Sequence, residues 1–295
     1  MEQESRNEPL FDWCQDRGAG VLLHPTSFPT GTGIGNLGGS ARRFLKFLKA
    51  AGMRYWQICP LGPTGFGDSP YQSFSSFAGN PYLIDWKPLI EAELLDESDL
   101  GNLQRLPRDR VDYGQLFKTF WPVLQEAATR YLARKKKPKL YGDLDAFYET
   151  HRHWLEPYAW FMVLKKAHHG GSWDVWPSAY QSFASAKKAG LPKGVPKNAL
   201  RKEVFYQYLF WGQWKELKHL AYDLGIQIIG DLPIFVSYDS SDLWANPQWF
   251  QVSPKTKKLK AQAGVPPDFF SAEGQLWGNP LYDWSALQKD DFQWW

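Results

Sequence analysis

The sequence has little cysteine, little net charge and no long hydrophobic run. Its two cysteines, Cys14 and Cys59, exclude a disulfide-stabilised scaffold and are typical of a cytoplasmic protein. A formal net charge of +3, from 34 Lys and Arg against 31 Asp and Glu, is too small for the basic surface with which proteins bind nucleic acid. No segment approaches the roughly 18 apolar residues of a membrane-spanning helix, and the first residues lack the apolar stretch of a signal peptide. We therefore expect a cytoplasmic protein that binds neither nucleic acid nor a membrane, and no protein partner is indicated.

Aromatic side chains, in contrast, are abundant. They make up 17% of the 295 residues, with 16 Trp, 14 Tyr and 19 Phe. Packing in the core explains most of them. A flat ring also packs on the apolar face of a sugar ring, so an aromatic residue in a polar loop is a candidate for sugar binding. The position of each ring decides between these two roles.

Apolar periodicity predicts an α/β fold. Three short apolar runs bounded by Gly and Pro predict buried strands over 20–24, 54–60 and 225–234. Amphipathic patterns predict helices over 40–51, with Ser40 as N-cap, and over 155–167 and 203–224. A hairpin is expected over 249–263, and the beginning of a helix over 287–295.

Changes in composition divide the chain into three parts. Residues 1–85 hold the first two strands and a turn-rich loop, 86–200 form a mostly helical inserted subdomain, and 201–295 hold the third strand and a second aromatic loop. Because a closed parallel barrel needs eight strands, three strands predict an open sheet or an incomplete barrel.

Several motifs that would carry other chemistry are weak. Gly33–Gly38 matches the G-x-G-x-x-G pattern of dinucleotide sites, but a loop separates it from the first strand and no acidic residue ends the second strand. The pairs His151/His153 and His168/His169 lack ligands at metal-binding spacing. Cys59 lies in a predicted strand, where a buried thiol is usually inert. We expect no metal and no cofactor, with a nucleotide-binding oxidoreductase kept as one alternative.

Carboxylates at strand ends and in aromatic loops are better candidates. In parallel α/β folds, ligands bind at the carboxyl ends of the strands. Asp231 ends the third strand, Asp68 precedes Ser69 and Tyr71 after the second strand, and Asp268 precedes Phe269 and Phe270 in the later loop. Such carboxylates accept hydrogen bonds from sugar hydroxyls while the rings cover the C–H face. The alternative for each Asp is a turn or cap, the role we expect for Asp242 and Asp283.

At these residues the sequence resembles the 4-α-glucanotransferases, also called amylomaltases or disproportionating enzymes, of the α-amylase superfamily. The resemblance runs in order from about Gly18 onwards and is looser over 90–200. It rests on eight segments, at 20–27, 54–65, 67–74, 79–85, 230–236, 244–247, 264–271 and 278–282.

The resemblance implies a (β/α)8 TIM barrel with a helical insertion after its second strand. It also implies transfer of an α-1,4-glucan segment to the 4-hydroxyl of another glucan, with retention and without a cofactor. Such chemistry needs a nucleophilic carboxylate and a carboxylic acid about 5–5.5 Å apart.

This sequence departs from the family pattern in its catalytic residues. No Arg-Ile-Asp-His-like motif of the fourth strand stands in it, and we expect the nucleophile and the acid/base to lie beyond Trp295. The chain is therefore expected to be the N-terminal portion of such an enzyme, with three barrel strands, and to be inactive and prone to association by itself. The alternative is a catalytically dead α-glucan-binding module.

The resemblance assigns substrate-binding roles to two groups of residues. Tyr71 would stack on the donor glucose with Ser69 beside it, and Asp231 would bind there or support the nucleophile. Asp268, Phe269 and Phe270 would form a lid over the acceptor side, with Trp277 near it. No catalytic residue and no metal ligand is assigned within the chain.

Overall fold

The computed structural model describes residues 17–295 and places three short parallel strands side by side. They are β1 (Gly20–Leu22), β2 (Tyr55–Gln57) and β3 (Gln227–Ile229), in the order β1-β2-β3. Gly20 pairs with Tyr55, which pairs with Gln227, so the three strands begin level with one another. The prediction of three parallel strands is confirmed, although each strand is shorter than the apolar run that predicted it.

The prediction that all three strands are buried is wrong for β1 and β3. Trp56, at the centre of β2, is fully buried against Phe28 and Phe44, whereas Leu22 is 61% exposed and Ile229 is also exposed. Residues alternate between the two faces of a sheet. Helices cover the Trp56 face, and within residues 17–295 little covers the other face, so continuous apolar runs end up half exposed.

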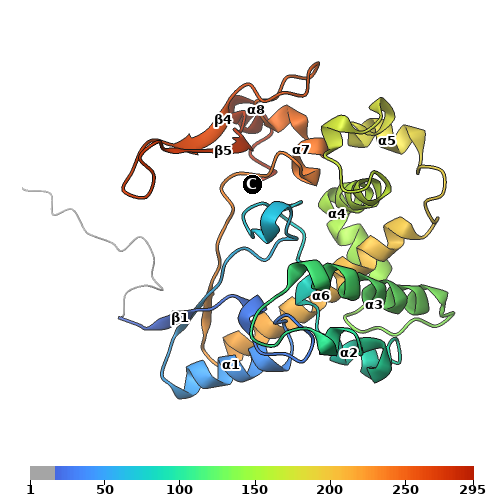
Figure 1. Ribbon diagram of the computed structural model, residues 1–295, viewed down its shortest axis with the longest axis vertical. Coiled ribbons are helices and arrows are strands. Elements are labelled where there is room, and N and C mark those ends of the chain that lie inside the picture. Colours follow the sequence, from blue (N-terminus) through green and yellow to red (C-terminus); the bar gives the residue numbers. More distant parts are fainter. Residues whose placement is uncertain (1–16) are drawn as a thin grey trace, which may run out of the picture.

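The first crossover helix, α1 (Gly39–Ala50), links β1 to β2 and covers the sheet (Figure 1). Its buried face consists of Ala41, Leu45 and Leu48, as the sequence predicts. Ser40 is not the N-cap, because Gly38 occupies that position and Ser40 Oγ donates to the Pro29 carbonyl instead.

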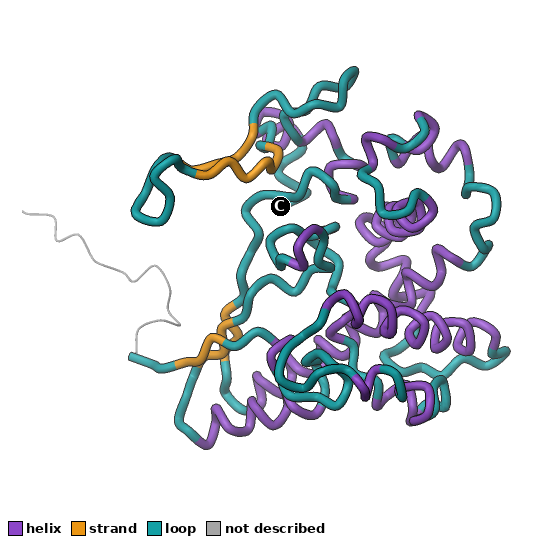
Figure 2. The backbone as a smooth tube through the Cα atoms, viewed as in Figure 1, coloured by secondary structure: helices purple, strands orange, loops and turns teal. Residues whose placement is uncertain are grey.

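The region between β2 and β3 is mostly helical, as predicted (Figure 2). Asp143 begins the second long helix by accepting from the amides of Asp145 and Ala146, so that helix starts eleven residues before the predicted Leu155. The helices are α2 (Lys87–Glu91), α3 (Tyr113–Ala133), α4 (Leu144–Ala167), α5 (Phe183–Ala189) and α6 (Ala199–Asp223).

Helix α6 differs from its prediction in its burial. The sequence favours one apolar face, yet every residue from Val204 to Phe210 is buried. One continuous hydrophobic cluster joins Trp56 of the sheet and Leu45 of α1 to residues of α3, α4 and α6. The division into 1–85, 86–200 and 201–295 stays a prediction.

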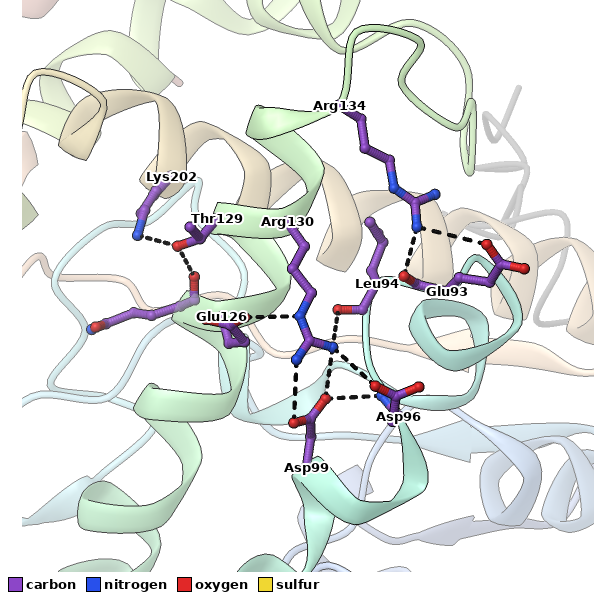
Figure 3. A network of polar contacts seen from close by, with 10 residues as sticks. Glu93, Leu94, Asp96, Asp99, Glu126, Thr129, Arg130, Arg134 and Lys202 are labelled. Atoms are coloured by element: carbon purple, nitrogen blue, oxygen red, sulfur yellow. Dashed lines mark hydrogen bonds and ion pairs between the residues drawn. The ribbon is translucent and has the colours of Figure 1, made fainter.

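An arginine network fixes α3 to the segment that precedes it (Figure 3). Arg130 contacts Glu126 at 2.8 Å and Asp99 at 2.9 Å, and it reaches the Leu94 carbonyl at 3.4 Å. Four residues later, Arg134 donates to the Ala92 carbonyl at 3.0 Å. Because α3 follows this segment only after a long irregular stretch, these contacts set where the helix lies.

The C-terminal part holds two further helices and a second sheet. Helices α7 (Ser241–Ala245) and α8 (Trp284–Lys289) pack in a second cluster around Trp173 and Trp244, and β4 (Gln262–Val265) pairs antiparallel with β5 (Gln275–Pro280). Of the hairpin predicted over 249–263, the structure contains a single antiparallel bridge between Val252 and Leu259. The β4–β5 hairpin was not predicted, and Asp283 caps α8 earlier than the predicted 287.

No helix within residues 17–295 is long and apolar enough to cross a bilayer. This agrees with the lack of long hydrophobic runs in the sequence.

Candidate functional site

Tyr71 and Asp231 meet at the carboxyl edge of the parallel sheet. Asp231 follows β3 by two residues, and Tyr71 lies in the loop that follows β2. The Tyr71 hydroxyl donates to Asp231 Oδ2 at 2.7 Å. Tyr71 is 48% exposed, and this hydrogen bond to a carboxylate is the main cause that raises its pKa to about 12. The phenol therefore stays protonated and its ring is presented to solvent in a fixed orientation.

Ser69 supports the turn that carries Tyr71. Its Oγ accepts from the Tyr71 amide at 3.3 Å, and its carbonyl accepts from the Gln72 amide at 3.1 Å. The base of this loop is closed by the Gly65 amide, which donates to the Gln72 carbonyl at 2.7 Å. The predicted trio of Ser69, Tyr71 and Asp231 thus lies together.

Cys59 is a member of this site that sequence reasoning missed. Its free thiol is only half-buried, so the prediction of a buried cysteine is wrong. It lies just past the end of β2, and its interaction with the Tyr71 hydroxyl further raises the Tyr71 pKa. Its place directly after the strand, at the ligand-binding edge, was the available signal.

The second predicted group lies on the β4–β5 hairpin. Asp268 Oδ1 accepts from the Phe270 amide at 2.9 Å and from the Ser271 amide at 2.8 Å, which is the turn role considered as its alternative. Phe269 is 97% exposed and Phe270 is 89% exposed, with their rings edge to face at 5.6 Å. Two large apolar rings are thus held at the tip of a turn.

Trp277 stands at the base of the same hairpin. Its indole N–H donates to Gln275 Oε1 at 3.1 Å, and its ring lies 6.3 Å from that of Phe235. The Asn279 side chain donates to the Val236 carbonyl at 2.9 Å and fixes the hairpin to the chain that leaves β3. One extended segment, 230–236, therefore runs from Asp231 to the hairpin (Figure 1). The two predicted groups therefore do not lie together: Asp231 and Tyr71 are at the start of this segment, and the aromatic rings of the hairpin lie beyond its end.

A cavity of about 150 Å³ lies beside Asp231. Loop residues 73–79 line it on one side and the aromatic rings of α6 on another, with Trp211 and Trp214 among them. The Trp211 indole N–H is buried without a partner among the described residues. Sequence reasoning placed Trp211 on the apolar face of the helix predicted over 203–224 and did not single out Trp214.

The glycine motif has a packing role. A Cβ placed on Gly35 would lie 2.0 Å from the Pro25 carbonyl oxygen, and one on Gly38 would lie 2.4 Å from the Asp85 carboxyl carbon. The Asp85 carboxylate thus lies against the N-cap of α1, where a pyrophosphate would have to bind. The glycines allow close contact within the chain rather than with a nucleotide.

Histidines and acidic residues do not gather around a metal site in the described part of the chain. No group of three or more His, Cys, Asp or Glu side chains within residues 17–295 could hold an ion. His168 instead stacks on Trp176 with ring centres 5.5 Å apart.

Comparison with known proteins identifies the family of the chain. A family model described as 4-alpha-glucanotransferase matches residues 23–295. The chain is 50% identical to the 4-alpha-glucanotransferase of Thermus thermophilus, over 95% of this chain and 54% of that protein. It is 39% identical to the chloroplastic/amyloplastic 4-alpha-glucanotransferase of Solanum tuberosum, over 97% of this chain and 50% of that protein. The chain thus spans about half the length of the curated relatives it matches.

Solved structures give the same result. The amylomaltase from Streptococcus agalactiae in complex with acarbose superposes with a TM-score of 0.87 at 39% identity, over 95% of this chain and 56% of that one. The amylomaltase from Corynebacterium glutamicum shares the fold, with a TM-score of 0.69 at 16% identity. Because the family model matches residues 23–295, the chain belongs to the 4-α-glucanotransferase family.

Proposed function

We propose that this chain forms the glucan-binding part of a 4-α-glucanotransferase. The Tyr71–Asp231 pair carries the proposal, because it presents a half-exposed ring beside a carboxylate at the edge of the sheet where α/β folds bind ligands. A ring of this kind packs on the C–H face of a glucose unit, and the carboxylate accepts from its hydroxyls. The family membership and the acarbose complex of a relative support the choice of an α-1,4-glucan as ligand.

The proposed reaction moves an α-1,4-glucan segment between starch-, glycogen- or maltooligosaccharide-type chains by a retaining double displacement. That mechanism needs two carboxyl groups about 5–5.5 Å apart, one as nucleophile and one as acid/base. We assign neither role within residues 1–295, which lack the Arg-Ile-Asp-His-like motif. We propose further that β1, β2 and β3 belong to a (β/α)8 barrel. We also propose that this chain by itself does not catalyse the transfer reaction.

The two residue groups receive different roles in this proposal. Tyr71, with Ser69 beside it, stacks on the donor glucose, and Asp231 both orients the Tyr71 ring and binds sugar hydroxyls. The exposed rings of Phe269 and Phe270, fixed by the Asp268 turn, cover the acceptor side, with Trp277 at the base of this lid. A lid of this kind favours a sugar over water as acceptor because it excludes solvent.

Binding is tested directly by calorimetric titration of the chain with acarbose and with maltotriose. Tyr71→Ala should weaken binding at least about tenfold, through lost stacking and lost orientation of Asp231. Tyr222→Ala is the matched control, since Tyr222 is 80% exposed on α6. Equal affinity of Tyr71→Ala and the unaltered chain would remove Tyr71 from the site.

Turnover is tested by incubating the chain with maltotriose and analysing the products. We expect neither glucose nor longer oligomers above the blank. Their appearance would contradict the proposed inactivity of residues 1–295.

A catalytically dead glucan-binding module is the second candidate, and the absence of the catalytic motif from residues 1–295 favours it. It shares the binding prediction. The two candidates differ in the reading frame beyond residue 295, where an Arg-x-Asp-His motif would favour the enzyme.

A further inference from the structure

A second cavity, of about 260 Å³, shares Phe77 with the cavity beside Asp231 but is lined by neither Tyr71 nor Asp231. It is bounded by α4, by the α7 region, and by the chain after α8. Its volume is below the roughly 300–1,000 Å³ of pockets for drug-sized ligands, which suits one small ring. Exposed side chains of His153 and Gln293 belong to its lining and mark its mouth.

Three aromatic rings form one wall of this cavity. Phe77 stacks on Trp154 with ring centres 6.3 Å apart and planes 16° apart, and Trp294 meets Phe77 edge to face at 5.6 Å. The indole N–H of Trp294 is buried and has no partner among the described residues. An N–H with no accessible surface cannot reach a ligand in the cavity, so Trp294 contributes its ring to this wall.

The polar wall is built around Asp242. Only 5% of the Asp242 surface is accessible to solvent. Its Oδ2 accepts from the Ser76 amide at 2.7 Å. Burial raises its pKa to about 6, and what opposes this shift is hydrogen bonding from Ser76. Asn246 lines the cavity beside it, with its Nδ2 3.3 Å from the Asp242 carbonyl. A buried carboxylate stabilised by so few donors favours a ligand that brings several hydroxyl groups.

We propose that this cavity binds a single pyranose ring, such as glucose or the terminal unit of a glucan, at a site separate from the Tyr71–Asp231 pair. The aromatic wall of Phe77, Trp154 and Trp294 packs on the sugar, and Asp242 and Asn246 bind its hydroxyls. The choice of glucose as the sugar rests on the proposed function. A single ring with few contacts binds with a millimolar dissociation constant.

The test follows the indole N–H resonance of Trp294 by NMR, with its assignment made from Trp294→Phe. Glucose should shift this resonance saturably in the full chain. Maltotriose distinguishes free glucose from the terminal unit of a glucan as the ligand. A shift with maltotriose shows that the end of a glucan enters the cavity, and no shift with maltotriose shows that the cavity takes only the free sugar. The lack of any saturable shift with glucose would overturn the proposal.

Variants separate this site from the proposed glucan site. Asn246→Leu should weaken glucose binding about tenfold by removing the amide and narrowing the cavity, with Asn102→Leu, at an exposed position, as matched control. Gln293→Ala, at the exposed mouth, is a second variant that spares the interior and should weaken binding less.

Tyr71→Ala distinguishes failure of this proposal from failure of the proposed function. We expect the Trp294 response to persist in that variant. Loss of the response in Tyr71→Ala together with its persistence in Asn246→Leu would assign it to the Tyr71 site and overturn the second site. Unaltered maltotriose affinity in Tyr71→Ala with a retained Trp294 response would contradict only the proposed function.

Discussion

At the scale of single residues, Asp242 shows how tertiary contacts change an assigned role. The sequence favours a cap or turn role for it, and it does lie in the first turn of α7. Ser240, however, is the N-cap, and the Asp242 carboxylate instead reaches across 166 positions to the Ser76 amide. A local pattern predicts local hydrogen bonds, so it could not predict this partner.

Burial of Asp242 predicts a pH-dependent effect on stability. Its pKa in the folded chain is about 6, against 3.8 for an ordinary Asp side chain, so between these values the folded state keeps a proton that the unfolded state has lost. The contribution of this group to folding stability therefore falls as pH rises from about 4 to about 6. Asp242→Asn, whose amide oxygen still accepts from Ser76, should gain stability relative to the unaltered chain over that window, by about 3 kcal/mol.

Urea unfolding across this pH range measures the difference. Asp109→Asn is the control, because its side chain is 77% exposed. A stability difference between Asp242→Asn and the unaltered chain that does not change with pH would contradict this account.

At the scale of elements, α6 organises the fold through two buried glutamines. Gln207 accepts from the Gly79 amide at 2.8 Å and donates to the Gly79 carbonyl at 2.9 Å. Gln213 makes the same pair of bonds with Asp85, at 2.7 and 3.0 Å. Each glutamine side chain thus forms hydrogen bonds with both the amide and the carbonyl of one residue in the loop after β2, as the backbone of a neighbouring strand would. This is how α6 holds the loop that also carries Tyr71.

Replacing one of these glutamines should destabilise the chain strongly. Gln207→Leu keeps the volume approximately but leaves the buried amide and carbonyl of Gly79 without partners, at a cost of about 2–4 kcal/mol. The exposed Gln104→Leu serves as control. Thermal or urea unfolding that gives the same stability for both variants would show that the Gln207 bonds contribute little.

The sequence predicted elements well where a local signal was complete. The first strand and α1 have their boundary residues nearby, with Gly52 in the left-handed conformation after α1, and they are found within a few residues of the predicted ranges. The start of α4 was missed, because its first turns are polar and only the Asp143 cap marks them. The β4–β5 hairpin was missed because β4 has only four residues and β5 lacks alternating apolar residues, as its exposed run Gln275–Trp277 shows.

The candidate site was predictable in part for the same reason. Tyr71 and Asp231 each follow their own strand, which the sequence reveals, but their hydrogen bond depends on the parallel alignment of β2 and β3. Trp211 and Trp214 approach the site from α6, whose orientation the sequence does not specify, whereas Cys59 follows β2 and could have been included.

At the scale of the whole molecule, one face of the sheet remains open within the described residues. Leu22 and Ile229 share a register row on that face, at 61% and 37% exposed, and the segment after β3 adds Leu232 and Ile234, at 63% and 62% exposed. Exposed apolar groups on strand edges favour association. We therefore expect this chain to self-associate in a concentration-dependent way.

Polar substitutions among these exposed apolar residues test the expectation. The double variant Leu232→Ser/Ile234→Ser should lower the average mass seen by sedimentation, whereas Phe47→Ser, at an exposed site on α1, should not. A monomeric unaltered chain at all concentrations would contradict the prediction.

The Tyr71–Asp231 contact also determines when the site can form. The two residues are separated by 160 positions, most of them in helices that can fold from local contacts. Tyr71 is therefore synthesised long before its partner, and the helical layer can assemble while the loop around Tyr71 still lacks the carboxylate that orients it. Closing so long a segment is slow compared with helix formation. We therefore expect the proposed glucan-binding surface to form after the helices, once α6 and β3 have docked.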